Sequence, residues 1–431
     1  MQHNSGQNGS PVSQSACGLD FGTSNSTLGV CGASGPRLLA LEGDHVAVPS
    51  AVFFGAEAQS AFLIGREAVA AYVDGVTGRL MRSLKSILGS ALIDERTAVY
   101  RRRIRFSEVI GLFLAELKQR AEAALDAPLD AVVMGRPVYF VDDDEAANRH
   151  AEETLRTVAQ AIGFREVSFQ YEPVAAALEF ERRHVSGEKI AMVADIGGGT
   201  TDFTVVRLSA AGERRDERAS DILANDGVRL GGTDFDRQLS MHAFMPGFGY
   251  RSPMKRGDIE VPSAPYWDLS TWSSVHQLYD PRRLAELREV RFDAREPALI
   301  DRLMNVIETR RGHSVLIAVE EAKIALSDRE RAETPLAWIE PGLSVEATRA
   351  GFEASAHALR ERLDRTARAC VAGAGLTPED IDYVFFTGGT SQMPAVRAAI
   401  LAPFEKAAAI DGDRFGAVGL GLAIEARRRY G

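Results

Sequence analysis

Two short segments of this 431-residue chain combine an aspartate, a glycine turn and hydroxyl side chains, the groups that bind phosphates and Mg²⁺. Residues 18–30 read GLDFGTSNSTLGV, and residues 193–206 read VADIGGGTTDFTVV. Glycines in a tight turn free backbone N–H groups and let a bulky anion approach closely. A single turn of this kind is better explained as an ordinary hairpin. Two in register, with Asp20 and Asp195 equivalent, favour a polyphosphate that is held from both sides.

Other phosphate, hydrolase and metal motifs are missing from the sequence. No Gly-Lys pair occurs, which excludes the P-loop of NTPases, and the G-x-S-x-G, H-E-x-x-H and kinase H-R-D patterns are also absent. The eight histidines show no metal-ligand spacing. The glycines of GAVGLG at 416–421 lie near the C-terminus and open no βα unit, so they predict close helix packing.

The elements that must position the two hairpins follow an α/β pattern, because short apolar runs bounded by Gly and Asp alternate with helical patterns. We expect strands at 17–20, 26–31, 131–135, 190–195, 204–208 and 383–387. We expect helices at 107–125, 145–163, 172–183, 299–309, 344–373, 394–401 and 420–429. The repeat of the hairpin implies two related lobes.

Composition narrows the class of protein further. The formal net charge of -10 argues against general binding to nucleic acid or to anionic membranes. Three cysteines without a Cys-x-x-Cys pair predict no disulfide framework and a reducing, cytoplasmic location. The polar residues 1–16 lack the features of a signal peptide and predict a disordered tail, and no apolar window is long enough to span a membrane.

Residues 246–300 interrupt the α/β rhythm. They contain two of the three tryptophans, Trp267 and Trp272, and six of the 17 prolines, which are Pro246, Pro253, Pro262, Pro265, Pro281 and Pro297. This composition predicts an insertion of loops and short helices with aromatic anchors. Both a packed surface elaboration and a partner-binding surface remain open.

Seven blocks in a fixed order carry a family resemblance over residues 17–426. They are GLDFGTSNS at 18–26, VVMGRPVYF at 132–140, YEPVAAALEF at 171–180, DIGGGTTDFTVV at 195–206, LGGTDFD at 230–236, VEEAKIALS at 319–327 and VFFTGGTSQMPAVR at 384–397. With these blocks the chain resembles the ATPase domain of Hsp70 chaperones, in the actin/hexokinase-like superfamily. The stretch DAREP at 293–297 is similar to the short bacterial Hsp70-like proteins of the YegD type.

The resemblance implies an actin-like ATPase fold with two related lobes, each a β-sheet with flanking helices, around a nucleotide cleft. After the tail at 1–16, the first lobe would span 17–188, with an inserted subdomain at about 45–105. The second lobe would span 189–431, with an inserted subdomain at about 237–330 that includes 246–300.

The same resemblance implies roles for the hairpin residues and their neighbours. Asp20 and Asp195 would hold Mg²⁺, Lys85 in SLKSILG would neutralise phosphoryl charge, and Glu172 and Asp202 would orient or deprotonate the attacking water. Asp195 and Thr200 are also counted among the catalytic residues. The residues implied to contact the phosphates are Gly22, Thr23, Ser24, Gly197, Gly198, Gly199, Thr200 and Thr201.

The remaining implied ligand contacts lie on the nucleoside side, where Gln392 departs from the Arg usual in the family. They are Glu320, Lys323, Ser327, Gly231, Gly232, Gly388 and Gly389. The register of a family Asp before the last helix falls on Phe415, with Asp413 nearby. From the residues alone, Lys85 also fits a solvated helix position, Glu172 a helix start, and Glu320, Lys323 and Ser327 an exposed helix face.

The resemblance predicts an ATP-binding protein that hydrolyses ATP weakly to ADP and phosphate with Mg²⁺, a chaperone or conformational switch. The chain ends where a peptide-binding domain would begin, so we expect no substrate clamp within it. The expected partners are ATP and a protein or co-chaperone at 246–300, with no nucleic acid and no membrane. The alternatives are a small-molecule kinase of the same fold and an actin- or FtsA-like assembly protein.

Overall fold

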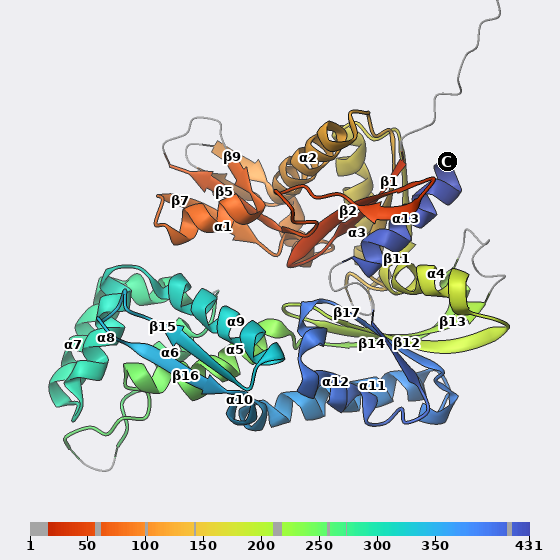
Figure 1. Ribbon diagram of the computed structural model, residues 1–431. Helices are drawn as coiled ribbons and strands as arrows, with labels where there is room; N and C mark the ends of the chain where they lie inside the picture. Colours follow the sequence, from red (N-terminus) through yellow and green to blue (C-terminus); the bar gives the residue numbers. More distant parts are fainter. Residues whose placement is uncertain are drawn as a thin grey trace, which may run out of the picture. The chain divides into compact units, whose positions relative to one another are not determined.

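The structure, a computed structural model shown in Figure 1, describes most of the chain and divides it into two units. The described residues are 16–56, 62–99, 102–141, 144–209, 218–256, 259–272, 274–411 and 416–431. Unit 1 comprises Met1–Ala51, Arg82–Arg183 and Phe415–Gly431, and unit 2 comprises Val52–Met81 and His184–Arg414. Of the tail predicted at 1–16, residues 1–15 lie outside the described ranges, and Ala16 begins the first strand.

Unit 1 is built on a sheet with the strand order β11-β10-β1-β2-β3, and β4 pairs with β2. The first strand β1 lies in the middle, antiparallel to β2 and parallel to β10. The strands are β1 (Ala16–Phe21), β2 (Asn25–Gly32), β3 (Gly35–Leu38), β4 (Val48–Pro49), β10 (Ala131–Arg136) and β11 (Glu166–Tyr171).

Unit 2 repeats this connectivity in a sheet with the order β14-β13-β12-β17-β18. Again the first strand, β12, lies in the middle, antiparallel to β13 and parallel to β17. The strands are β12 (Glu188–Ile196), β13 (Thr201–Ser209), β14 (Ile222–Val228), β17 (Tyr383–Thr387) and β18 (Ala408–Asp411). The repeated topology confirms the α/β class and shows that the hairpin repeat in the sequence reflects two sheets of one design.

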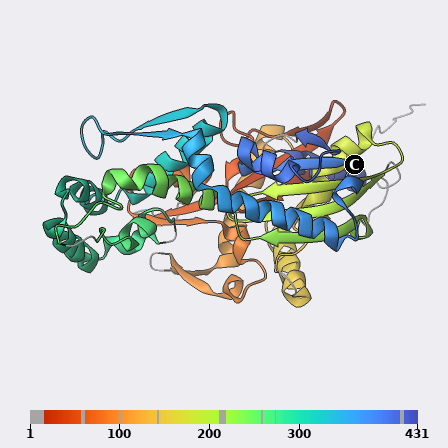
Figure 2. The same ribbon diagram turned by 90° about the horizontal axis from the view of Figure 1, so that it is seen from below.

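Helices complete both units. In unit 1 they are α2 (Phe106–Leu125), α3 (Glu145–Ala161), α4 (Glu172–His184, which enters unit 2 at its last residue) and α13 (Ala417–Tyr430). In unit 2 they include α1 (Gly65–Val73), α5 (Gly232–Leu239), α9 (Gly312–Asp328), α11 (His357–Gly373) and α12 (Pro394–Leu401). Figure 2 shows α11 running along the sheet of β12, β13 and β14. Within the described part of the chain, no helix has the length and apolar character to cross a membrane.

Smaller sheets and turns fill the rest. The strands β5 (Ala51–Gly55), β6 (Phe62–Ile64) and β7 (Gly78–Arg82) form a three-stranded sheet, and the pairs β8 (Arg96–Val99) with β9 (Arg102–Arg105) and β15 (Arg331–Pro335) with β16 (Ser344–Thr348) form hairpins. Short 3₁₀ helices lie at η1 (Leu84–Ile87) and η2 (Ala91–Asp94), and a π-helical turn at η5 (Ser240–Phe244).

The prediction of a single helix at 344–373 is wrong. Residues 344–348 form the strand β16, in which Val345 and Ala347 are buried while their neighbours are exposed, a period of two that marks a strand. The Thr348 hydroxyl then accepts a hydrogen bond from the Gly351 amide and begins a short helix, α10 (Arg349–Ser355), which breaks at Ala356 before α11.

The described part of residues 246–300 forms helices and loops, as the sequence predicts, and its fully buried aromatic side chains are Phe248 and Tyr266 rather than the tryptophans. Tyr266 is fully buried and its hydroxyl donates to the Phe248 carbonyl, whereas Trp267 is 41% exposed. Trp272 packs in part against the unit 2 core. The elements here are η6 (Met245–Phe248), α6 (Ala264–Leu269), η7 (Val275–Tyr279), α7 (Pro281–Asp293) and the start of α8 (Pro297–Glu308).

The last helix, α13, lies against β1, β2 and β10 of its own unit, and glycines permit the close approach (Figure 1). A Cβ atom on Gly18 of β1 would lie 2.3 Å from the backbone of Leu422, and one on Gly421 would lie 1.9 Å from the Ala175 carbonyl oxygen. Gly419 and Gly421 therefore permit close helix packing, as the sequence predicts for the glycines at 416–421.

We predict that Gly421→Ala lowers the free energy of unfolding by about 1–3 kcal/mol, because the added methyl group has no room beside the backbone of α4. Urea denaturation measures the loss. Gly32→Ala is the matched control, since its Cβ would meet nothing within 4 Å. An equal effect of the two substitutions would contradict the packing described for α13.

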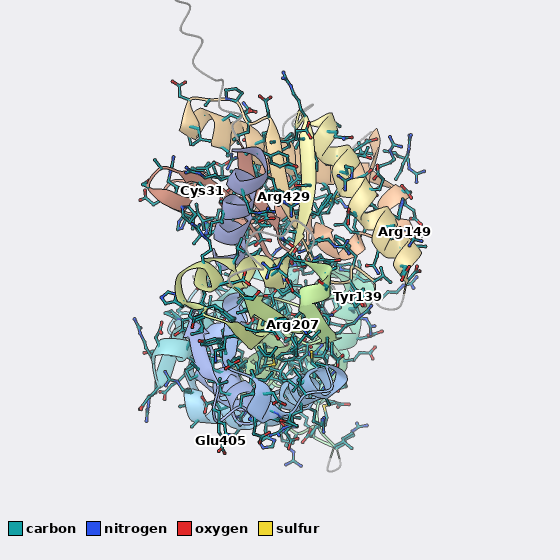
Figure 3. All side chains as sticks on the ribbon, turned by 90° about the vertical axis from the view of Figure 1, so that its right-hand side faces the viewer. Cys31, Tyr139, Arg149, Arg207, Glu405 and Arg429 are labelled. Atoms are coloured by element: carbon teal, nitrogen blue, oxygen red, sulfur yellow. The ribbon has the colours of Figure 1, made fainter. Side chains whose placement is uncertain are left out.

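A buried carboxylate fastens the end of α13. Glu425 is 1% exposed, and its Oε1 atom accepts hydrogen bonds from Arg428 (2.6 Å) and Arg429 (2.8 Å), the latter labelled in Figure 3. Burial by itself raises the pKa of Glu425, but the hydrogen bonds and charges of the two arginines outweigh it and hold the pKa below its usual value.

We predict that Glu425→Gln lowers the free energy of unfolding at pH 7 by about 3–5 kcal/mol, because it leaves two guanidinium groups without their partner. A depressed pKa gives stability above the unfolded value, about 4.3, that is lost as pH falls through the folded value. The deficit of the variant therefore shrinks as urea unfolding is repeated toward pH 3. Glu405→Gln, at an exposed site, is the control. A deficit independent of pH would contradict this assignment.

Candidate functional site

In unit 1, the hairpin of β1 and β2 turns at Gly22, Thr23 and Ser24, as the sequence predicts. Asp20 lies directly opposite Thr27 in the antiparallel register. The turn is tight, because a Cβ on Gly22 would lie 2.2 Å from the Asn25 carbonyl oxygen.

Ser50, which the sequence did not indicate, holds this turn in place. Its hydroxyl donates to the Gly22 carbonyl at 2.7 Å, and its amide donates to the Ser24 carbonyl at 2.9 Å. Ser50 lies between β4 and β5, far from the hairpin in sequence, so no local pattern could have identified it.

Unit 1 also brings together two residues that were predicted separately. The Lys85 Nζ atom lies 2.6 Å from Glu172 Oε1, and the two side chains are 11% and 10% exposed. Lys85 lies on the 3₁₀ turn η1, and Glu172 is the first residue of α4. Lys85 is therefore not a solvated helix residue, and Glu172 does more than favour the helix start.

The place of Glu172 depends on a glycine in the neighbouring strand. A Cβ on Gly135 of β10 would lie 3.1 Å from Glu172 Cγ and 3.3 Å from Oε1. Since β11 pairs with β10 in parallel and leads directly into α4, the sheet register fixes where the carboxylate lies. A largely buried cation and anion are thus held in contact at the end of the sheet.

In unit 2, three segments meet at the turn between β12 and β13. The Gly197 amide donates to the Thr200 carbonyl, the Gly232 amide to the Gly197 carbonyl, and the Thr233 amide to the Gly198 carbonyl. The Thr390 hydroxyl donates to the Gly197 carbonyl at 3.0 Å. The predicted residues at 197–200 and 231–232 therefore belong to one backbone cluster, with Gly199 and Thr200 exposed, and the side chain of Thr390, next to the predicted Gly388 and Gly389, binds to it.

The threonines of this turn differ in position. Thr201 is fully buried, and its hydroxyl donates to the Leu230 carbonyl at 2.7 Å, so its side chain fastens the hairpin to the end of β14. The Thr200 side chain is exposed at the turn.

Two carboxylates face each other across this hairpin. Asp195 and Asp202 are directly opposite in the antiparallel register of β12 and β13. Like charges at opposite positions destabilise a sheet, and a divalent cation would offset their repulsion. Such oxygen donors fit Mg²⁺, which proteins hold through one or two carboxylates together with phosphates and water. In the described ranges no group of three or more His, Cys, Asp or Glu side chains could hold a metal.

On α9, Lys323 is 8% exposed, and its Nζ atom lies 2.7 Å from Asp236 Oδ1 on α5 and 3.4 Å from the Gly232 carbonyl. This places the ammonium group beside the Gly197–Gly232 backbone cluster. Glu320 and Ser327 are partly exposed on the same helix. Asp236 was not indicated by the sequence, although it lies in the block LGGTDFD, because an acid in a helix gives no signal of a partner on another helix.

The residues that depart from the family pattern are only partly described. Gln392 is partly exposed, and its side-chain amide donates to the Ser391 hydroxyl at 3.4 Å. Asp413 and Phe415 lie outside the described residues.

The comparisons with known proteins agree in one family. The family model for "Hsp70 protein" matches residues 16–251 and 301–430, leaving out 252–300. The chain is 30% identical over 432 residues to "Chaperone protein HscA homolog" of Bordetella petrii, which covers 95% of this chain and 57% of that protein. It is 25% identical over 443 residues to "Heat shock 70 kDa protein, mitochondrial" of Pisum sativum, covering 96% and 55%. The chain thus spans a little over half the length of these relatives.

We predict that Gly231→Ala displaces the turn at 197–200, because its Cβ would lie 2.6 Å from the backbone atoms of Gly198 and Gly199. Hydrogen exchange at the Gly232 and Thr233 amides should accelerate, and the free energy of unfolding should fall by about 1–3 kcal/mol. Gly247→Ala, whose Cβ would meet nothing within 4 Å, is the control. Unchanged exchange at both amides would show that the three segments are not coupled as described.

Proposed function

The chain belongs to the Hsp70 family, and we propose that it binds ATP with Mg²⁺, hydrolyses it to ADP and phosphate, and acts as a chaperone-type conformational switch. The family match also confirms the actin-like ATPase fold that the sequence predicted. The observation that carries the proposal is the repeated hairpin, which places Asp20 and Asp195 at equivalent strand positions beside glycine turns.

The phosphate donors in this proposal come from both hairpins. Backbone amides around Gly22–Ser24 and Gly198–Thr200, with the hydroxyls of Thr23, Ser24 and Thr200, would offer hydrogen bonds to an anion. Asp20 and Asp195 would hold Mg²⁺, which neutralises phosphate charge when it is bound. Loss of the γ-phosphate would remove hydrogen bonds to these donors, and this is the chemical basis of a switch.

The reacting phosphoryl group would be served by the Lys85–Glu172 pair. An ammonium group fixed by a carboxylate at 2.6 Å stays in one place without reorganisation, which suits the stabilisation of phosphoryl oxygens. Glu172 and Asp202 offer carboxylates that orient or deprotonate the attacking water. Lys323 and its partner Asp236 would support the nucleoside side, with Glu320, Ser327, Gly388 and Gly389.

The finer parts of the proposal concern the partner and the location. Residues 252–300, which the family model leaves out, expose Ile259 (60%) and Phe292 (74%), large apolar side chains that a protein partner would cover. The cysteines Cys17, Cys31 and Cys370 are free thiols, which supports the proposal that the protein functions in a reducing compartment such as the cytoplasm.

We predict that Lys85→Met slows phosphate release by about a hundredfold while the affinity for ADP changes little. Single-turnover phosphate release and calorimetric ADP binding measure the two quantities. Lys118→Met is the matched control, because Lys118 of α2 is a similarly buried lysine, 12% exposed and paired with Glu122. ADP binding also shows that the variant is folded.

Three outcomes would contradict the proposal. Phosphate release that is unaffected by Asp195→Ala would overturn the assignment of the site. Turnover that requires a small-molecule acceptor would favour a kinase, and filaments that form on addition of ATP would favour an assembly protein.

A further inference from the structure

Thr387 lies beside Asp195 at the end of the unit 2 sheet, and none of the roles above uses it. It is the last residue of β17, which runs parallel to β12, and the register pairs Thr387 with Asp195. On the other side of Asp195 the antiparallel register pairs it with Asp202. Paired residues in neighbouring strands project from the same face of a sheet. Asp202, Asp195 and Thr387 therefore form a row across one face.

The hydroxyl group of Thr387 is buried without a partner. The residue is 5% exposed, and its Oγ1 atom has no hydrogen-bond partner within the part of the chain that the structure describes. The preceding residues of the strand, Val384, Phe385 and Phe386, are apolar and buried. A valine would fill the same volume without leaving a polar group unsatisfied, so the hydroxyl needs an explanation.

The Asp195 carboxylate is close to this end of β17. Gly388 has a φ of +78°, and a Cβ on it would lie 3.0 Å from Asp195 Oδ1 and 2.3 Å from the Ile196 carbonyl oxygen. The glycine after Thr387 thus leaves the space that the carboxylate occupies. A rotation about the Cα–Cβ bond of Thr387 between staggered positions would turn its hydroxyl toward the neighbouring strand.

We infer that Thr387 is a positioning residue, whose hydroxyl donates a hydrogen bond to the Asp195 carboxylate when that carboxylate binds Mg²⁺. Carboxylates that bind metals are in turn oriented by hydrogen bonds from groups behind them, and loss of such a bond typically weakens metal binding by about 10-fold or more. The inference rests on the proposed function, because it assigns Mg²⁺ to Asp195. It goes beyond that function, because it proposes that the buried Thr387 hydroxyl raises the affinity for Mg²⁺.

The test compares Thr387→Val, which removes the hydroxyl, with Thr387→Ser, which retains it. Calorimetric ADP binding is titrated with Mg²⁺ in each variant of the full chain, and repeated with a chelator in place of the metal. We expect the Mg²⁺ concentration for half-maximal tight ADP binding to rise about 10-fold in Thr387→Val and to stay near wild type in Thr387→Ser. Binding of ADP without metal should not change.

Ser168→Ala is the matched control, because the Ser168 hydroxyl on β11 is also buried without a partner in the described part of the chain, but it belongs to unit 1 whereas Asp195 belongs to unit 2. Thr387→Val with the Mg²⁺ dependence of wild type would overturn the inference. So would an equal loss of ADP affinity with and without Mg²⁺, which would indicate a structural role. A wild-type chain that does not bind ADP would instead overturn the proposed function itself, and the inference with it.

Discussion

The candidate site in unit 2 depends on contacts between backbone segments that lie too close together to leave room for a Cβ atom. The turn at 197–200 is held by the amides of residues 232 and 233, and this contact exists only because Gly231 has no Cβ. Gly388, at a positive φ, gives the same freedom at the end of β17. These glycines therefore allow three segments that are distant in the sequence to meet at one turn.

Charge imposes the second condition on the site. Lys85 with Glu172, and Lys323 with Asp236, are pairs in which all four side chains are about 10–11% exposed. Removal of one partner would leave a buried charge uncompensated, which makes each pair costly to change and fixes the remaining group in position. Asp195 and Asp202 are the opposite case, since the register places like charges together. The fold thus holds two lysines in contact with carboxylates and places two acidic residues at paired positions in one hairpin.

Local sequence signals predicted the helices and strands well where the signals were strong. They failed where contacts between distant elements determine the structure or the role of a residue. The hairpins, β17 and α12 follow from apolar runs and turn residues, and the repeat correctly indicated two sheets of one topology. The helix expected at 344–373 failed because a short strand with a period of two precedes the helical pattern. Ser50 and Asp236 could not be found, because each matters through a partner on a distant element. Sequence nominated Lys85 and Glu172 one at a time, and only the fold makes them a pair.

The two hairpins, although repeated, differ in the residue that lies opposite their first aspartate. Opposite Asp20 the register places Thr27, whereas opposite Asp195 it places Asp202. One hairpin thus presents a single carboxylate and the other presents two. In the proposed function, phosphate binding would need only a glycine turn and hydroxyls in each hairpin, whereas Mg²⁺ binding and water activation would need carboxylates. The extra carboxylate at position 202 places two acidic residues at paired positions in the hairpin of unit 2. Under the proposed function, divergence of the repeat at this single position would give the hairpin of unit 2 a second carboxylate for water activation, while both hairpins would keep their glycine turns.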